Sequence, residues 1–167
     1  MKPWWIDTDP GVDDAWAIRM MLAQPLIRVL GLGVVGVNVG LPYTLSNACR
    51  LADQSPYPLP IHPGASSALI GGLPDASFVH GQDGFGDAGL SPPEASPDGQ
   101  VAALALVEAA RRHPGELGVL ALGPLTNLAL ALMLEPELPR LCRRLVVMGG
   151  ALGARGNTAI PSAEFNF

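Results

Sequence analysis

Four aspartates crowd one short stretch near the start of the chain. Residues 7–14 are Asp-Thr-Asp-Pro-Gly-Val-Asp-Asp, which places four carboxylates within eight residues. Carboxylates that converge repel one another, and either protonation or a bound cation relieves that repulsion. A divalent ion that prefers oxygen ligands, Ca²⁺ or Mg²⁺, suits such a group, and the turn is expected to aim Asp9 and Asp14 at one point. The structural alternative, in which one aspartate closes a turn and Asp13 caps a helix, explains four carboxylates poorly.

Asn38 and His80 are the next polar residues placed for contact with a ligand. Asn38 follows an apolar run of strand length, and both a turn residue and a ligand contact stay open for it. His80 begins a stretch, residues 80–87, that contains three glycines and two aspartates. This composition predicts a flap beside a substrate, with a solvated loop histidine as the alternative. His62 and His113 are expected to have structural roles only.

Further polar groups follow two later apolar runs. The backbone carbonyl of Leu122, at the tip of an expected strand, is predicted to be free for a metal or a substrate. Thr126 and Asn127 are expected to be hydrogen-bond partners at the start of the next helix. The last stretch offers amide and carboxyl groups that suit recognition of hydroxyls, although an irregular polar tail would be the default for this segment alone. These groups belong to Asn157, Glu164 and Asn166.

The apolar runs also predict the elements that must position these residues. Strands are expected over 4–7, 27–35, 59–62, 117–122 and 144–148. Helices are expected over 13–23, 41–52, 101–113 and 125–134, and a long loop over 64–99. This alternation predicts an α/β fold, with an open, mostly parallel sheet, helices on both faces and a single domain over residues 1–167. Ligands of such sheets bind beyond the carboxyl ends of the strands, where the polar residues stand.

Composition narrows the classes of function. Hydrophobic residues make up 49% of the 167, enough for a core, and the net charge of −5 argues against nucleic-acid binding. The apolar stretch 117–134 is interrupted by Gly123 and Pro124, so a strand followed by a helix explains it better than a membrane span. Residues 1–10 lack the apolar region of a signal peptide, which predicts a cytoplasmic protein. Cys49 and Cys142 are expected to be buried, reduced thiols.

Taken together, these segments resemble the inosine–uridine-preferring nucleoside hydrolase family, with a Rossmann-like core. The signature is Asp7-Thr8-Asp9-Pro10-Gly11-Val12-Asp13-Asp14-Ala15, and the resemblance extends along the whole chain. It is supported in order by Asn38, His80-Gly81-Gln82-Asp83-Gly84, Gly123-Pro124-Leu125-Thr126-Asn127, Val147-Met148-Gly149-Gly150, and the stretch from Gly156-Asn157 to Ala163-Glu164-Phe165-Asn166.

The resemblance implies an activity and assigns roles to residues. The activity is Ca²⁺-dependent hydrolysis of the N-glycosidic bond of ribonucleosides, giving ribose and a free base, by a protein that forms dimers or tetramers. Ca²⁺ would be bound by Asp9, Asp14 and the Leu122 carbonyl, and Asp9 would also take a proton from the metal-bound water that attacks the anomeric carbon. The implied substrate-binding residues are Asp13, Asn38, His80, Asn157, Glu164 and Asn166. Carboxylates near the sugar would stabilise its oxocarbenium character.

The end of the chain departs from the family pattern. Members continue past the position of Phe167 with a second half that supplies another aspartate ligand and, in many members, a histidine that assists the leaving base. The expectation is therefore a C-terminally truncated core with weak Ca²⁺ binding and low activity. Two alternatives stay open: a non-catalytic remnant that binds ribosides, and a haloacid dehalogenase-like phosphohydrolase. The second expects a later lysine, whereas Lys2 is the only lysine.

Overall fold

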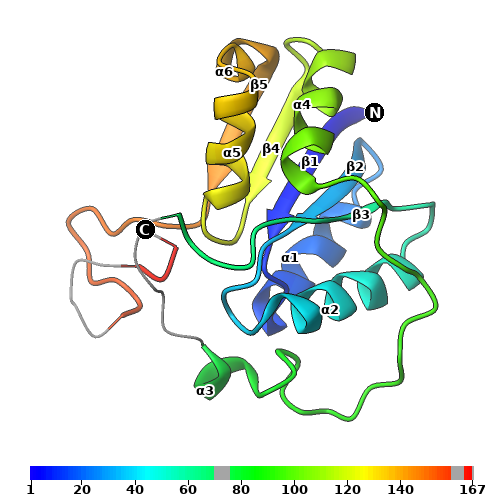
Figure 1. Cartoon of the computed structure of the whole chain (residues 1–167), viewed down its shortest axis with the longest axis vertical. Coiled ribbons are helices and arrows are strands. Elements are labelled where there is room, and N and C mark those ends of the chain that lie inside the picture. Colours follow the sequence, from blue (N-terminus) through cyan, green and yellow to red (C-terminus); the bar gives the residue numbers. More distant parts are fainter. Residues whose placement is uncertain (70–75, 159–163, 167) are drawn as a thin grey trace.

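The chain folds around one parallel sheet of five strands (Figure 1). The computed structural model describes residues 1–69, 76–158 and 164–166. The strands are β1 (Lys2–Thr8), β2 (Ile27–Val34), β3 (Ile61–Pro63), β4 (Leu117–Ala121) and β5 (Cys142–Val147). The helices are α1 (Val12–Leu22), α2 (Leu41–Asp53), α3 (Ser77–His80), α4 (Ala102–Arg112), α5 (Thr126–Leu134) and α6 (Leu138–Leu141).

The sequence predicted the strands and the four longer helices, with ends that differ by a few residues. It did not predict α3 or α6, which are single turns of helix with four residues each. Helices this short have too few periodic positions to leave an apolar pattern. The expected structureless loop over 64–99 was therefore wrong in one place, since α3 lies inside it and carries His80.

The strand order places β1 at the centre of the sheet. The order is β3-β2-β1-β4-β5, so the chain moves outward in one direction through β2 and β3 and returns to the other side of β1 with β4. β1 is buried from Pro3 to Thr8, as expected of a parallel strand that is covered on both faces. The direction of winding reverses between β1 and β4. A crevice opens at such a switch point, beyond the carboxyl ends of the strands.

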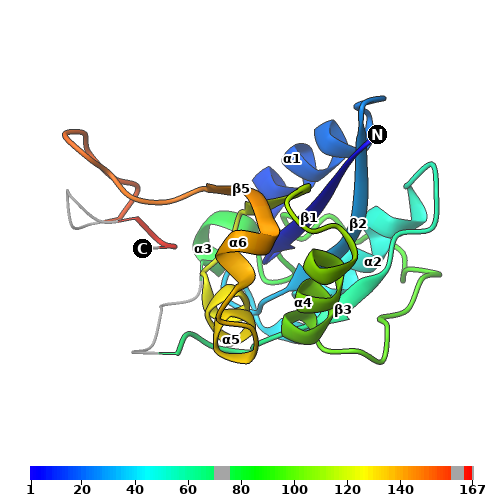
Figure 2. The same ribbon diagram turned by 90° about the horizontal axis from the view of Figure 1, so that it is seen from above.

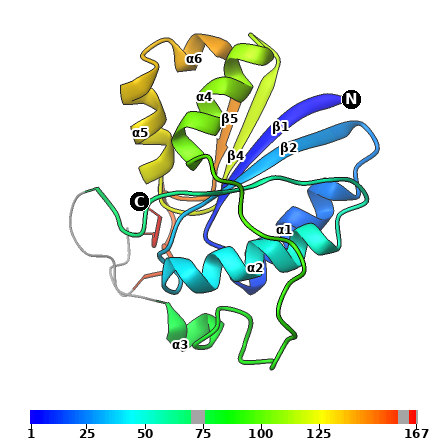
Figure 3. The same cartoon turned by 45° about the vertical axis from the view of Figure 1, so that its right-hand side comes forward.

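Two hydrophobic clusters cover the two faces of the sheet. On one face Trp5 and Leu117 pack with apolar residues of α4 and α5. On the other face Ile6 and Leu32 pack with residues of α1 and α2. Figure 2 shows the strands between α1 on one side and α4 and α5 on the other, and Figure 3 shows α4, α5 and α6 grouped apart from α1 and α2. Helices on both faces are thus confirmed.

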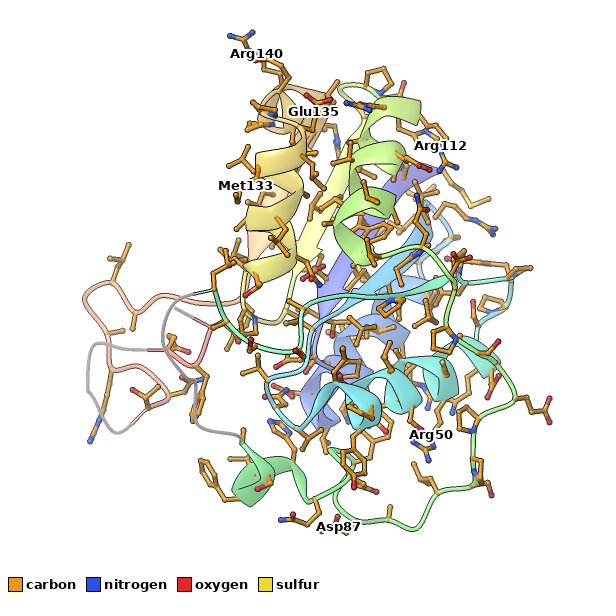
Figure 4. All side chains as sticks on the ribbon, in the orientation of Figure 1. Arg50, Asp87, Arg112, Met133, Glu135 and Arg140 are labelled. Atoms are coloured by element: carbon orange, nitrogen blue, oxygen red, sulfur yellow. The ribbon has the colours of Figure 1, made fainter. Side chains whose placement is uncertain are left out.

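β5 forms one edge of the sheet and is less covered than the other strands. Leu145 and Val146 have exposed fractions of 53% and 40%, and Met133 of the adjacent α5 reaches 75% and points outward in Figure 4. Residues 148–158, which follow β5, run away from the helical layers (Figure 2). No helix in the described ranges is both long and apolar enough to cross a membrane. Both cysteines are unpaired, with Cys49 buried and Cys142 partly buried.

Candidate active site

Asp9 and Asp14 meet at the carboxyl end of β1, where Asn38 contacts both. The backbone N–H of Asn38 donates to Oδ2 of Asp9 at 3.0 Å. Its side-chain Nδ2 donates to the Asp9 carbonyl at 2.9 Å and to Oδ2 of Asp14 at 3.4 Å. Asn38 follows β2, the neighbour of β1, so the parallel sheet brings these residues together from 29 and 24 positions apart. The predicted convergence of Asp9 and Asp14 is confirmed.

Asp14 is held by two further hydrogen bonds from the same turn. The Thr8 hydroxyl donates to Oδ1 at 2.6 Å, and the Gly11 N–H donates to Oδ2 at 3.1 Å. Gly11 is the residue that precedes α1, so Asp14 also caps the first turn of that helix. The capping role proposed for Asp13 therefore belongs to Asp14. Its carboxylate is fixed by the fold before any ligand binds.

Burial makes the charges of these two carboxylates costly. Desolvation by burial raises the pKa of Asp9 well above its usual value, and the nearby charge of Asp14 raises it further. Burial likewise raises the pKa of Asp14 to about 6, although the Thr8 hydrogen bond acts in the opposite direction. No lysine or arginine pairs with either carboxylate in the parts of the chain that the structure describes. A divalent cation would relieve both costs.

The other two aspartates of the turn point elsewhere. Asp7 is buried beneath the turn, where Asn127 donates to its two oxygens at 3.4 and 3.2 Å. Asn127 also accepts from the Ala65 N–H at 2.9 Å, so its expected role at the helix start was wrong, and it links β1 to the chain after β3. Asp13 lies at the surface with a side chain that is 75% exposed. The turn therefore contributes two converging carboxylates rather than four.

Leu122 lines the same cavity as Asp9, but its carbonyl is not free. The next residue, Gly123, lies close to Asp9, because a Cβ built on it would sit 2.5 Å from Oδ1 of Asp9. The carbonyl accepts a hydrogen bond of 2.6 Å from Nδ2 of Asn166, which also donates to the Met148 carbonyl at 3.2 Å. The prediction of a free carbonyl was wrong in this respect. Asn166, from the far end of the chain, occupies the acceptor that was expected to hold a metal.

His80 reaches the turn from a flap, which we define as residues 76–87. Its Nδ1 accepts a hydrogen bond of 3.4 Å from the Val12 N–H and lies 3.9 Å from Oδ1 of Asp13. The His80 side chain is only 12% exposed. The flap begins where the Ala76 N–H donates to the Asn38 carbonyl at 2.8 Å. His80 therefore lies over the acidic turn, as the flap prediction required, and it is not a solvated loop residue.

Asn157 and Glu164 form hydrogen bonds within the segment that follows β5. The Asn157 N–H donates to Oε1 of Glu164 at 3.1 Å, and Oδ1 of Asn157 accepts from the Phe165 N–H at 3.0 Å. Ala163, part of the same predicted motif, and Phe167 lie outside the described residues. Contact of Asn157 and Glu164 with a sugar stays a prediction.

A cavity of about 220 Å³ joins these groups at the switch point. Asp14 and Glu164 do not line it, whereas seven of the residues singled out in the sequence do. They are Asp9, Asp13, Asn38, His80, Leu122, Asn157 and Asn166. The remaining lining residues are apolar, and the sequence assigned none of them a role in the site, although Met148 and Phe165 stand in the family motifs. These apolar residues are Ala76, Val79, Met148 and Phe165.

The donor set fits a hard cation in part. Asp9, Asp14 and the Leu122 carbonyl are all oxygen ligands, and the two carboxylates are buried and share the Asn38 contact. Within the described ranges, however, no group of three or more Asp, Glu, His or Cys side chains is arranged to hold a metal ion. The residues present could thus supply part of the coordination shell of a Ca²⁺ ion.

The fold and the cavity together define a class of protein. A parallel α/β sheet with a cavity at its switch point, lined by carboxylates, amides and a histidine, suits a small ligand with several hydroxyls. The sequence matches the model of the family "Inosine-uridine preferring nucleoside hydrolase" over residues 4–167. The chain belongs to this family, which confirms the resemblance and removes the phosphohydrolase alternative.

Individual relatives agree with this assignment. Uridine nucleosidase 1 of Arabidopsis thaliana is 42% identical over 163 residues, covering 96% of this chain and 48% of its own length. The non-specific ribonucleoside hydrolase RihC of Shigella flexneri is 39% identical over 164 residues, covering 98% and 53%. The solved plant nucleoside hydrolase PpNRh1 has a TM-score of 0.90 at 36% identity, covering 99% of this chain and 52% of that one. The chain spans about half the length of the relatives it matches.

Proposed function

We propose that the protein acts in Ca²⁺-dependent hydrolysis of the N-glycosidic bond of ribonucleosides. One observation carries the proposal: Asp9 and Asp14, both buried, converge with Asn38 at the edge of a cavity lined by further polar groups. Membership of the family supports it, as do relatives named uridine nucleosidase and ribonucleoside hydrolase. A riboside, whose hydroxyls need several polar partners, is the substrate class that fits.

Asp9, Asp14 and the Leu122 carbonyl would hold the calcium ion. When bound, Ca²⁺ would lower the pKa of water in the cavity and orient the 2′- and 3′-hydroxyls of ribose. Asn166 now donates to the Leu122 carbonyl and would be displaced from it as the ion binds. The displaced amide of Asn166 would be free to donate to a ribose hydroxyl. Leu122 would then act as a metal ligand and Asn166 as a substrate-binding residue, which are the roles predicted for them.

The chain's own residues supply the proton transfer and the grip on the sugar. Asp9 lines the cavity and would accept the proton of the water whose oxygen forms the new bond to C1′. The bond from C1′ to the base nitrogen breaks, and its electron pair leaves with the base. Carboxylates beside the ring would stabilise the positive charge that builds on the sugar. Asp13, Asn38 and Asn157 would order the hydroxyls, and His80 would face the base from the flap.

A second function, riboside binding without turnover, is favoured by two observations. The described residues bring together only two carboxylates for the ion, and the Leu122 carbonyl is already bonded to Asn166. A site with fewer charged ligands binds Ca²⁺ more weakly. If the ion is not retained, the cavity would still offer amides and carboxylates to a sugar, but no water would be activated.

Release of free ribose decides between the two functions. Uridine and inosine would be incubated with the protein in Ca²⁺ and, separately, in excess chelator, and ribose would be followed by a reducing-sugar assay. We expect release that needs Ca²⁺ and is lost in Asp9→Asn, whereas Asp53→Asn, an aspartate at the end of α2 away from the cavity, leaves it unchanged. Uridine binding without ribose release would establish the non-catalytic function instead, and absence of both would remove the proposal.

A further inference from the structure

Asn47 is a buried polar residue that none of the roles above uses. It lies on α2, is 1% exposed, and does not line the cavity. Its Nδ2 donates to two backbone carbonyls from distant parts of the chain. One is the Pro10 carbonyl in the acidic turn, at 3.2 Å, and the other is the Asp83 carbonyl in the flap, at 2.8 Å. One amide group therefore joins the two segments that carry Asp9 and His80.

The orientation of this amide is fixed by Arg50, one turn further along α2. Nη1 of Arg50 donates to Oδ1 of Asn47 at 2.9 Å, so the oxygen faces a cation and the nitrogen faces the two carbonyls. Arg50 also donates from Nε to the Ser91 carbonyl at 3.0 Å, beyond the flap. Figure 4 shows Arg50 pointing from α2 toward this loop. The nitrogen of the Asn47 side chain thus donates to two acceptors, and its oxygen accepts from a donor.

The flap is shaped to approach this amide. A Cβ built on Gly84 would lie 2.8 Å from Nδ2 of Asn47, and Gly84 has a φ of +81°, which favours glycine. On the other side of the turn, a Cβ on Gly11 would lie 2.7 Å from Nδ1 of His80. Two glycines therefore let the flap pack directly onto α2 and onto the turn. Neither contact leaves room for a side chain.

We propose that Asn47 is a positioning residue that clamps the flap onto the acidic turn, so that His80 is held against Val12 and Asp13. It acts through backbone carbonyls and does not touch the substrate. The role of Asn47 in placing His80 at the site rests on the proposed function. The clamp between the flap and the turn is a property of the fold alone. Asn47 thereby explains how a glycine-rich loop keeps a histidine 12% exposed at a defined place.

Amide hydrogen exchange of the flap tests the clamp. Asn47→Asp keeps the size of the side chain but turns two donors into an acceptor that faces two carbonyls. Gly84→Ala disturbs the same contact from the flap side without changing α2. Thr44→Val is the matched control, because Thr44 is buried on the same helix and its hydroxyl donates to the Leu41 carbonyl of that helix. Exchange of the amides of residues 84–86 would be followed by NMR, together with the ring nitrogen shifts of His80.

We expect flap exchange to rise about tenfold or more in Asn47→Asp and in Gly84→Ala, with a shifted His80 signal and no such change in Thr44→Val. The double variant should exceed the faster single variant by less than about threefold, since both remove one contact. Unchanged flap exchange in both single variants would overturn the clamp, as would an equal rise throughout β1, which would indicate a general structural role.

Uridine titration of the same variants tests the link to the site. Asn47→Asp should weaken uridine binding about tenfold, because His80 is no longer held. Unaltered affinity together with faster flap exchange would contradict the positioning role. Failure of the unaltered chain to bind uridine would count against the proposed function, and the exchange result alone would then decide the clamp.

Discussion

The acidic turn and the segment after β5 both contribute polar residues to the cavity, but the fold holds them in different ways. Asp14 is 5% exposed and accepts hydrogen bonds from Thr8, Gly11 and Asn38. Asn157 is exposed, and its bonds run to Glu164 and Phe165 of the same segment. Asn166 reaches back to the core, where its side chain donates to the Leu122 carbonyl.

This contrast indicates that the two regions contribute to the site in different ways. Groups of the turn are placed by the sheet and its core, so their geometry is set before a ligand arrives. Groups of the later segment are placed by local bonds at the surface, which cost little to rearrange. The ion site is therefore expected to be built in, whereas the sugar contacts of the later segment are expected to adjust on binding.

The largest effect should come from removing a charge in the turn. Asp14→Asn keeps the size of the side chain but removes one of the two converging carboxylates. We expect Ca²⁺ affinity to fall on the order of 100-fold, because ligand charge sets the strength of such sites. Calorimetry would measure it, with Glu164→Gln as the matched change in the later segment. A similar loss in Glu164→Gln would break the contrast between the two regions.

A pair of identical substitutions compares the regions in stability. Asn127→Ala removes the donor to buried Asp7 and the acceptor for the Ala65 N–H, and it should cost about 2 kcal/mol. Asn157→Ala changes an exposed residue, and it should cost about 0.5 kcal/mol or less. Urea unfolding followed by circular dichroism would give both values. Equal losses would show that the later segment is as much a part of the fold as the core asparagine.

The smallest effect sharpens the comparison where the later segment reaches the core, at the Leu122 carbonyl. Asn166→Ala frees the Leu122 carbonyl, so Ca²⁺ affinity should rise about threefold, while uridine affinity should fall by a similar factor. Calorimetric titration with each ligand measures the two changes. A fall in Ca²⁺ affinity would mean that Asn166 supports the ion site rather than competing for its carbonyl.

Much of this arrangement could be predicted from the sequence, for physical reasons. Buried parallel strands leave continuous apolar runs, and a ligand site follows their carboxyl ends, so β1, β2 and β4 and the residues after them were found. The family motif pointed to Asp9, Asp14 and Asn38. These predictions depend on short-range patterns and on topology, both of which can be inferred from the order of residues along the chain.

Other features depend on contacts between distant segments that no pattern records. The partner of Asp7 is Asn127, which lies 120 residues away, and the Leu122 carbonyl is covered by Asn166, 44 residues later. Asn47 looks like an ordinary helix residue until the flap is seen packed against it. Single turns such as α3 are set by their surroundings rather than by their own sequence.

A crystal structure of the protein with Ca²⁺ and ribose, with the ion identified by its anomalous scattering, tests the central claim most directly. The account predicts one ion at about 2.3–2.6 Å from oxygens of Asp9, Asp14 and the Leu122 carbonyl, with ribose hydroxyls on its cavity side and Asn166 displaced from that carbonyl. An ion bound elsewhere, or Asp9 and Asp14 turned apart with the sugar at a different place, would contradict it.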